Sequence, residues 1–187
     1  AAAAPVWDLP APRPTPERIA SWLEEHPDHP DLLELTIGLR LAENDGRPTM
    51  EDVELLERYA SARPVDPTPH RLLVRLYLDQ DTPEAREALI PHLAFLDARE
   101  QKASTYATEL ARSLSRLGRW DEASRYAERA TQIAPYDAGL RELAASAAIK
   151  TRNIDEARRH ITALTLLEPE RTLHQRRLEA LERMTER

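Results

Sequence analysis

Apolar residues recur three and four positions apart along most of the chain, the spacing that places side chains on one face of an α-helix. Ile19, Trp22 and Leu23 form one such stripe, and Leu32 and Leu35 begin the next. Glycine, which tight sheet turns require, occurs only 4 times, so the pattern favours an all-α fold. We expect about ten helices: 15–25, 31–43, 50–63, 71–80, 84–98, two helix pairs within 104–171, and a last helix over 171–186.

The 15 prolines cluster between these segments and seldom interrupt them. Pro91 is an exception, and we expect it to kink the helix over 84–98 because proline lacks an N–H and clashes with the preceding turn. Residues 1–14 contain four prolines and no helical period, which predicts an extended linker. The repeat-like part of the chain is then expected over residues 15–187.

The stretch HPDHPD at residues 26–31 allows two interpretations. Two imidazoles and two carboxylates within six positions resemble a metal site, but His26 and His29 lack the i, i+4 spacing of a helical zinc pair. No third ligand is evident. We therefore interpret the stretch as a joint between helices, with both histidines exposed and Asp28 or Asp31 capping the helix that follows.

A repeat of 34 residues is visible in the second half of the chain. Asp121-Glu122-Ala123 recurs as Asp155-Glu156-Ala157, Pro135 recurs as Pro169, and Trp120 recurs as Ile154. A fixed period made of two helices is typical of a solenoid.

This pattern resembles the tetratricopeptide repeat (TPR) family over residues 104–169. The residues that carry the resemblance have these places in the TPR pattern: Leu110-Ala111 in the first helix, Gly118 in the turn, Trp120 as the large residue, Ala123 and Ala130 as small packing residues, and Pro135 as the stop. In the next unit Arg152 replaces the turn glycine. The resemblance implies an all-α, right-handed superhelix. Its units are expected at about 31–65, 66–103, 104–137 and 138–171, followed by a capping helix at 171–186.

Charge and composition exclude several functions. The net charge is −7, and residues 1–60 alone carry 13 acids against 5 arginines, which disfavours nucleic-acid binding. There is no cysteine, hence no thiolate zinc site and no cysteine nucleophile. No apolar run approaches the length of a membrane span. We find neither a catalytic constellation nor a cofactor motif, and we expect a non-enzymatic protein without cofactor.

The TPR resemblance implies a concave groove lined by the first helix of each pair. Arginines in it can pair with carboxylates, and apolar side chains beside them can accept apolar groups. The predicted peptide-binding residues are Val74, His70, Tyr77, Thr108, Arg112, Arg116, Glu142, Ile149 and Lys150.

We therefore expect a scaffold that binds a protein partner, or an extended peptide with acidic or apolar side chains. One alternative is a spacer or oligomerisation domain of a larger, enzymatic bacterial protein, because the chain begins AAAAP without a methionine and arginine greatly outnumbers lysine. An RNA-binding helical repeat is a further alternative, which the negative charge disfavours.

Overall fold

The computed structural model describes residues 14–185, and in this part of the chain it contains ten α-helices, one short 3-10 helix and no strand. The prediction of an all-α fold with about ten helices is confirmed. Residues 1–13 of the expected linker lie outside the described residues. The helices are α1 (Pro16–Glu25), α2 (Pro30–Glu43), η2 (Met50–Asp52), α3 (Val53–Ala62), α4 (Thr68–Gln80), α5 (Pro83–Arg99), α6 (Thr105–Arg116), α7 (Trp120–Ile133), α8 (Ala138–Lys150), α9 (Ile154–Leu167) and α10 (Thr172–Thr185).

Side chains cap the starts of α1, α5, α8 and α9, but not those of α2, α3, α6 or α7. The side chains of Thr15, Thr82 and Asp137 each accept a hydrogen bond from the backbone N–H three residues later. In helix α2 the N-cap is His29, and no side chain caps it. The expectation that Asp28 or Asp31 caps this helix is wrong. Asp31 lies instead in the first turn, where a carboxylate favours the positive end of the helix dipole.

The chain divides into two compact units, one ending at Leu72 and the other starting at Leu73. The first unit contains α1, α2, α3 and the beginning of α4 around the buried side chains of Leu33, Leu56 and Tyr59. The Tyr59 hydroxyl donates a 2.5 Å hydrogen bond to Asp66. Burial, together with this bond to a carboxylate, raises the pKa of Tyr59.

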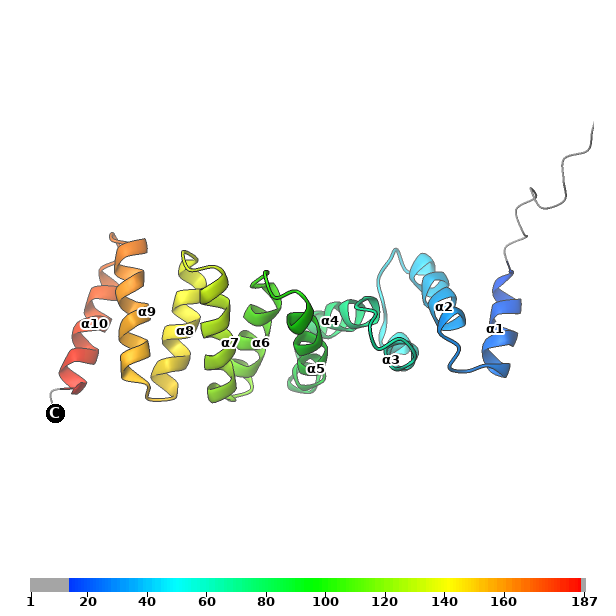
Figure 1. Cartoon of the computed structure of the whole chain (residues 1–187), viewed down its shortest axis with the longest axis horizontal. Helices are drawn as coiled ribbons and strands as arrows, with labels where there is room; N and C mark the ends of the chain where they lie inside the picture. Colours follow the sequence, from blue (N-terminus) through cyan, green and yellow to red (C-terminus); the bar gives the residue numbers. More distant parts are fainter. Residues whose placement is uncertain (1–13, 186–187) are drawn as a thin grey trace, which may run out of the picture. The chain divides into compact units, whose positions relative to one another are not determined.

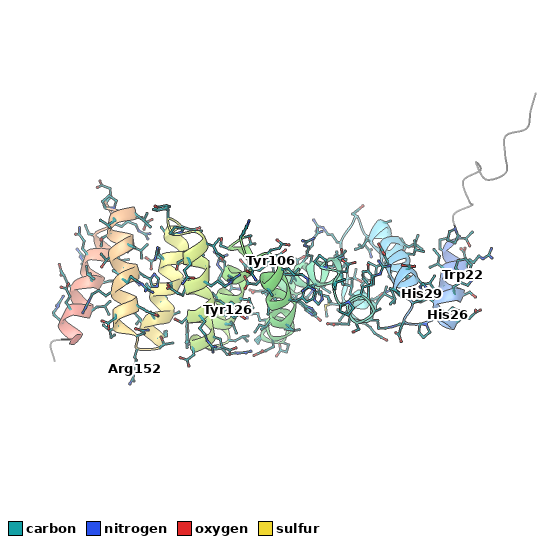
Figure 2. The ribbon with its side chains drawn as sticks, in the orientation of Figure 1. Trp22, His26, His29, Tyr106, Tyr126 and Arg152 are labelled. Carbon is teal, nitrogen blue, oxygen red and sulfur yellow. The ribbon has the colours of Figure 1, made fainter. Side chains whose placement is uncertain are left out.

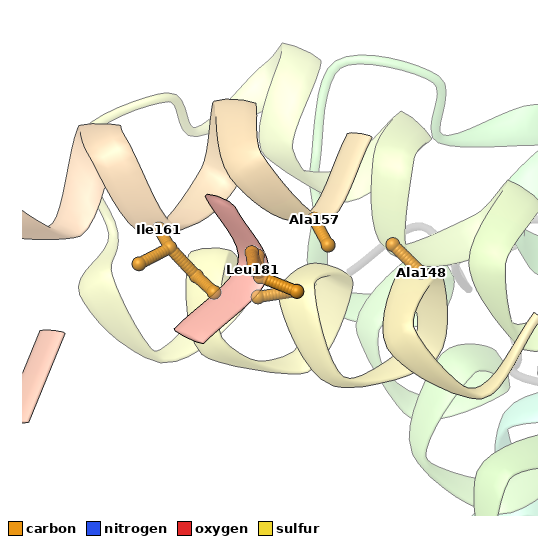
Figure 3. Close-up of a cluster of buried hydrophobic side chains, with 5 residues drawn as sticks. Ala148, Ala157, Ile161 and Leu181 are labelled. Carbon is orange, nitrogen blue, oxygen red and sulfur yellow. The ribbon is translucent and has the colours of Figure 1, made fainter. Parts of the chain in front are cut away.

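In the second unit the helices pack in chain order, and Figure 1 shows α6 to α10 lying side by side. Small residues stand where these helices touch. Ala148 of α8 and Ala157 of α9 are fully buried against Ile161 and Leu181, which brings α10 into the same core (Figure 3). A methyl group at the contact lets the helix axes approach closely, as ridge-into-groove packing requires.

Five equivalent joints separate one helix pair from the next. At each joint a backbone N–H bonds back to the carbonyl three residues earlier, at 3.0–3.2 Å. The carbonyl residues of these turns are His26, Arg63, Glu100, Ala134 and Glu168. Their spacings are 37, 37, 34 and 34 residues. The stretch HPDHPD is the first of these joints, and both of its histidines are exposed (Figure 2).

The helix pair α4–α5 has three more residues than each of the two pairs that follow. The three additional residues lie in the first turn of α5. Counted back from the joint that follows each helix pair, the buried residues Leu89, Leu93 and Leu96 of α5 are equivalent to Ala123, Ala127 and Ala130 of α7. The small residue Ala85 does not match Ala123, although the sequence suggests it. The additional turn precedes the equivalent part of the helix, and α5 continues through Pro91 to Arg99.

The turns inside the helix pairs use a left-handed residue. Gly118 has φ +75°, whereas Arg152 and Asp81 adopt φ +58° and +47° at the equivalent position. Figure 2 shows the Arg152 side chain pointing away from the helices. Because side chains are rarely found in this conformation, Asp81 and Arg152 carry backbone strain that Gly118 avoids.

Candidate functional site

The first helices of the second unit share one exposed surface. Position by position, α4 matches α6 with a spacing of 37 residues and α6 matches α8 with a spacing of 34. Leu78, Ser115 and Ile149 are one equivalent set, and none of them is buried. We call the following residues the first-helix face: Arg75, Leu78 and Asp79 on α4; Thr105, Arg112, Ser115 and Arg116 on α6; Gly139, Ser146, Ile149 and Lys150 on α8.

Of the three predicted residues near α4, the structure buries two and places the third in the first unit. Val74 and Tyr77 are only 7 % and 8 % exposed, and the Tyr77 ring stacks on the buried His92. His70 is half-buried and belongs to the first unit. The predicted units at about 66–103 and 104–137 imply a spacing of 38 between their first helices. The spacing between the two first helices is 37, so each predicted position is one residue early.

On α6 the two predicted arginines are exposed and the predicted threonine is not. The Thr108 hydroxyl is buried and donates to the Ser104 carbonyl at 2.7 Å. Arg112 pairs with Glu109 of its own helix at 2.7 Å. Arg116 reaches Asp81 at the end of α4, also at 2.7 Å. Both guanidiniums are thus available at the surface, with carboxylates beside them.

On α8 the predicted residues differ in their surroundings. Glu142 accepts a hydrogen bond from Arg177 of α10 at 2.6 Å and lies 3.4 Å from the buried His174 ring. It therefore bridges the last two first helices. Ile149 is exposed, and the Lys150 ammonium lies over the Trp120 ring, 5.6 Å from its centre.

A pocket of about 210 Å³ opens between α4, α5 and α6, entirely within the second unit. Tyr77 and Leu89 form part of its wall, and three arginines and two acids supply its charge. These charged residues are Arg86, Arg112, Arg116, Asp81 and Glu109. Their formal sum is +1, in a chain whose net charge is −7.

Asp81 stands at the centre of this charge cluster. One carboxylate oxygen, Oδ1, accepts from Arg86 at 2.5 Å and from Arg116 at 2.7 Å. The Arg86 hydrogen bond, assisted by the charges of Arg86 and Arg116, holds the pKa of Asp81 below its usual range. Of these residues, the sequence predicted Arg116 but neither Asp81 nor Arg86. The run DTPE at 81–84 indicates only a helix start, and Arg86 lies two residues beyond it.

Elsewhere in the second unit, charged clusters bind helix to helix. His160 is buried between Arg141 of α8 and Glu128 of α7. Because arginine can only donate, Nδ1 accepts from Arg141 and the ring proton sits on Nε2, which faces Glu128 at 2.9 Å. Burial lowers the pKa of His160. Such a residue fixes helix packing and presents no chemistry to solvent.

Residues 14–185 hold no group of three or more histidines and carboxylates arranged to bind a metal ion. Within the same residues no helix combines the length and the apolar character needed to cross a bilayer.

Neither a protein-family profile nor a curated protein sequence matches this chain. Solved structures do. The chain is similar to YrrB, described as a TPR protein with an unusual peptide-binding site, with a TM-score of 0.60 and 14 % identity over 90 % of this chain and 84 % of that one. It is also similar to MamA, with a TM-score of 0.53 and 16 % identity over 83 % and 82 % of the two chains.

A third similar structure, MamA of Desulfovibrio magneticus RS-1, gives a TM-score of 0.52 and 14 % identity over 83 % of this chain and 84 % of that one. At these identities the comparisons show the fold. The expectation of a TPR-like helical solenoid is confirmed.

Proposed function

Since the chain has the fold of TPR proteins, we propose that it is a non-enzymatic scaffold that binds an extended peptide on its first-helix face. The peptide carries acidic side chains with apolar ones between them. The observation that carries this proposal is the cluster of Arg86, Arg112 and Arg116 around one pocket of a chain that is acidic overall. A guanidinium binds a carboxylate through two parallel hydrogen bonds, which gives both strength and orientation.

The apolar part of the ligand follows from the repeat. Leu78 and Ile149 are exposed at equivalent positions of α4 and α8. Two exposed large apolar residues beside arginines suit a ligand in which apolar and acidic groups alternate.

The spacing of the helices suits an extended strand. Packed helices lie about 8–10 Å apart, and an extended chain rises about 3.3 Å per residue. Since α6 and α8 also contact each other directly, about three ligand residues lead from one of these first helices to the other.

A binding titration tests the proposal. The probe is a short fluorescein-labelled peptide of alternating glutamate and leucine, and its fluorescence anisotropy reports the Kd. For the double variant Arg112→Ala with Arg116→Ala we expect the Kd to rise about tenfold, because two exposed charge contacts together contribute on the order of 1–2 kcal/mol.

The matched control is Arg125→Ala with Arg159→Ala, which changes the net charge by the same amount but on the second helices α7 and α9. Its Kd should stay within about twofold of the wild-type value, a change of under 0.5 kcal/mol. If both double variants weaken binding equally, the contact is only a response to net charge and the proposed face is wrong. If no acidic peptide binds, the alternative of a spacer or oligomerisation domain gains support.

A further inference from the structure

The charge cluster around Asp81 has the form of an occupied binding site. A carboxylate, that of Asp81, already sits between two guanidiniums, and a third from Arg112 lines the same pocket. Arginine pairs are the usual protein partners of an incoming carboxylate. In the free protein, one of the chain's own side chains fills that position.

Arg86 distinguishes the helix pair α4–α5 from the next two helix pairs, α6–α7 and α8–α9. Counted back from the joint that follows each helix pair, it is equivalent to Trp120 and Ile154, the large residues at the start of α7 and α9. Here a guanidinium stands where the later units place an apolar group. Its side chain is 16 % exposed, and its buried Nε–H has no hydrogen-bond partner among the described residues. Buried donors nearly always have a partner, so we infer that this N–H donates its hydrogen bond to a bound ligand.

Asp81 likewise differs from the equivalent residues of the next two helix pairs. The equivalent turn residues of the next two units are Gly118 and Arg152, so the turn itself does not require a carboxylate. The Asp81 side chain is 64 % exposed, and its partner Arg116 is 60 % exposed. An ion pair this open to water is held weakly, and a rotation of the Asp81 side chain is enough to release Arg116.

We propose that the pocket between α4, α5 and α6 is a carboxylate subsite, and that Asp81 is a built-in competitor that a ligand carboxylate displaces from Arg116 and Arg86. The inference rests on the proposed peptide scaffold and deepens it by assigning one subsite and the residue that tunes its affinity. The ligand group is the side-chain carboxylate of an acidic residue or the carboxylate at a peptide C-terminus. Both present the same two oxygens to the arginines.

The test uses two variants with opposite expected effects. Asp81→Asn keeps a residue type that tolerates the left-handed turn but removes the competing charge. We expect it to tighten binding of the glutamate–leucine peptide at least fivefold. Arg86→Gln removes the Nε–H donor and should weaken binding at least fivefold. Matched probes with an amidated C-terminus, or with glutamine in place of glutamate, show which carboxylate occupies the subsite.

A second readout does not depend on the peptide. The Nε–H resonance of Arg86 in a ¹H–¹⁵N spectrum reports its hydrogen bonding directly. Titration with glutarate should shift this signal at lower concentration in Asp81→Asn than in the wild-type protein, while the Nε–H signal of Arg125 on α7 stays unchanged.

The outcomes separate the two proposals. If the wild-type protein binds the peptide but Asp81→Asn binds no more tightly, the competitor role is wrong and the scaffold stands. If no peptide binds but glutarate shifts the Arg86 signal as expected, the subsite stands and the peptide scaffold fails. If glutarate leaves Arg86 unshifted and Arg86→Gln leaves the peptide Kd unchanged, the subsite does not exist.

Discussion

At the scale of single residues, the turn between α8 and α9 is the clearest departure from the repeat. Arg152 adopts φ +58° where the preceding unit has Gly118 at +75°. A non-glycine residue in this conformation costs on the order of 1 kcal/mol or more. Replacing Arg152 by glycine would remove this strain, but the greater conformational freedom of glycine in the unfolded chain offsets part of the stabilisation.

We therefore expect Arg152→Gly to raise the free energy of unfolding by about 0.5–1 kcal/mol. That corresponds to an increase in Tm of about 1–4 °C for a chain of this size. Gly118→Ala is the converse control. The site has room for a methyl group, but its φ of +75° is unfavourable for alanine, so the substitution should lower the free energy of unfolding by a similar amount. Thermal unfolding measures both. A Tm for Arg152→Gly equal to or below the wild-type value would contradict the strain.

The second prediction at this scale concerns pH. Burial holds the pKa of His160 below the usual histidine value of 6.5, although the charge of Glu128 acts in the opposite direction; the charges of Arg159 and Arg141 also lower it. Below about pH 6.5 the unfolded chain therefore binds a proton that the folded chain does not. The contribution of this residue to stability is complete above that pH and is lost as the pH falls below it.

His160→Gln should consequently flatten the dependence of Tm on pH between about pH 5 and 7, whatever its effect on Tm at neutral pH. Carboxylates with lowered pKa values, such as that of Glu168, titrate below this pH window and do not contribute to the change of Tm within it. Thermal unfolding of both proteins across the window is the measurement. Parallel curves would show that His160 does not titrate differently in the two states.

At the scale of helices, α10 belongs to the core of the second unit. Leu181 is buried with Ala148, Ala157 and Ile161, whereas Leu173 of the same helix is 52 % exposed. Removing buried methyl groups costs both transfer free energy and a cavity. The last helix is thus an integral cap of the solenoid, as repeat arrays require.

Leu181→Ala should lower the free energy of unfolding by about 2–4 kcal/mol, and Leu173→Ala by under about 0.5 kcal/mol. Urea unfolding followed by circular dichroism distinguishes them. Equal effects of the two substitutions would mean that α10 is not packed as described.

At this scale the sequence predicted most of the fold. Prolines marked four of the five joints, with Gln101 in the equivalent place after Glu100, and the 34-residue period located α6 to α9. The additional turn of α5 was not visible, because Ala85 offers a plausible match to Ala123 one helical turn too early. That error moved the predicted face of α4 by one residue, from Leu78 to Tyr77. Side-chain burial depends on register, and a single sequence with three extra residues in one unit does not fix it.

At the scale of the whole molecule, the site arises from residues that the repeat does not share. Arg112 and Arg116 could be predicted from their positions in a first helix. Asp81 and Arg86 could not, since each departs from the residue type that the following units place there. Their meeting at one pocket depends on how α4, α5 and α6 pack, which is tertiary information. The fold class could thus be predicted from the period, whereas the charge cluster required the structure.

The salt dependence of peptide binding tests the central claim most directly, namely that charges on the first-helix face hold an acidic ligand. The Kd of the glutamate–leucine peptide is measured from low to high salt for the wild-type protein, for Arg112→Ala with Arg116→Ala, and for Arg125→Ala with Arg159→Ala. Salt screens exposed charge pairs, so binding to the wild type and to the control pair should weaken steeply with salt. The first double variant should lose most of that dependence. The same slope in all three proteins would contradict the account.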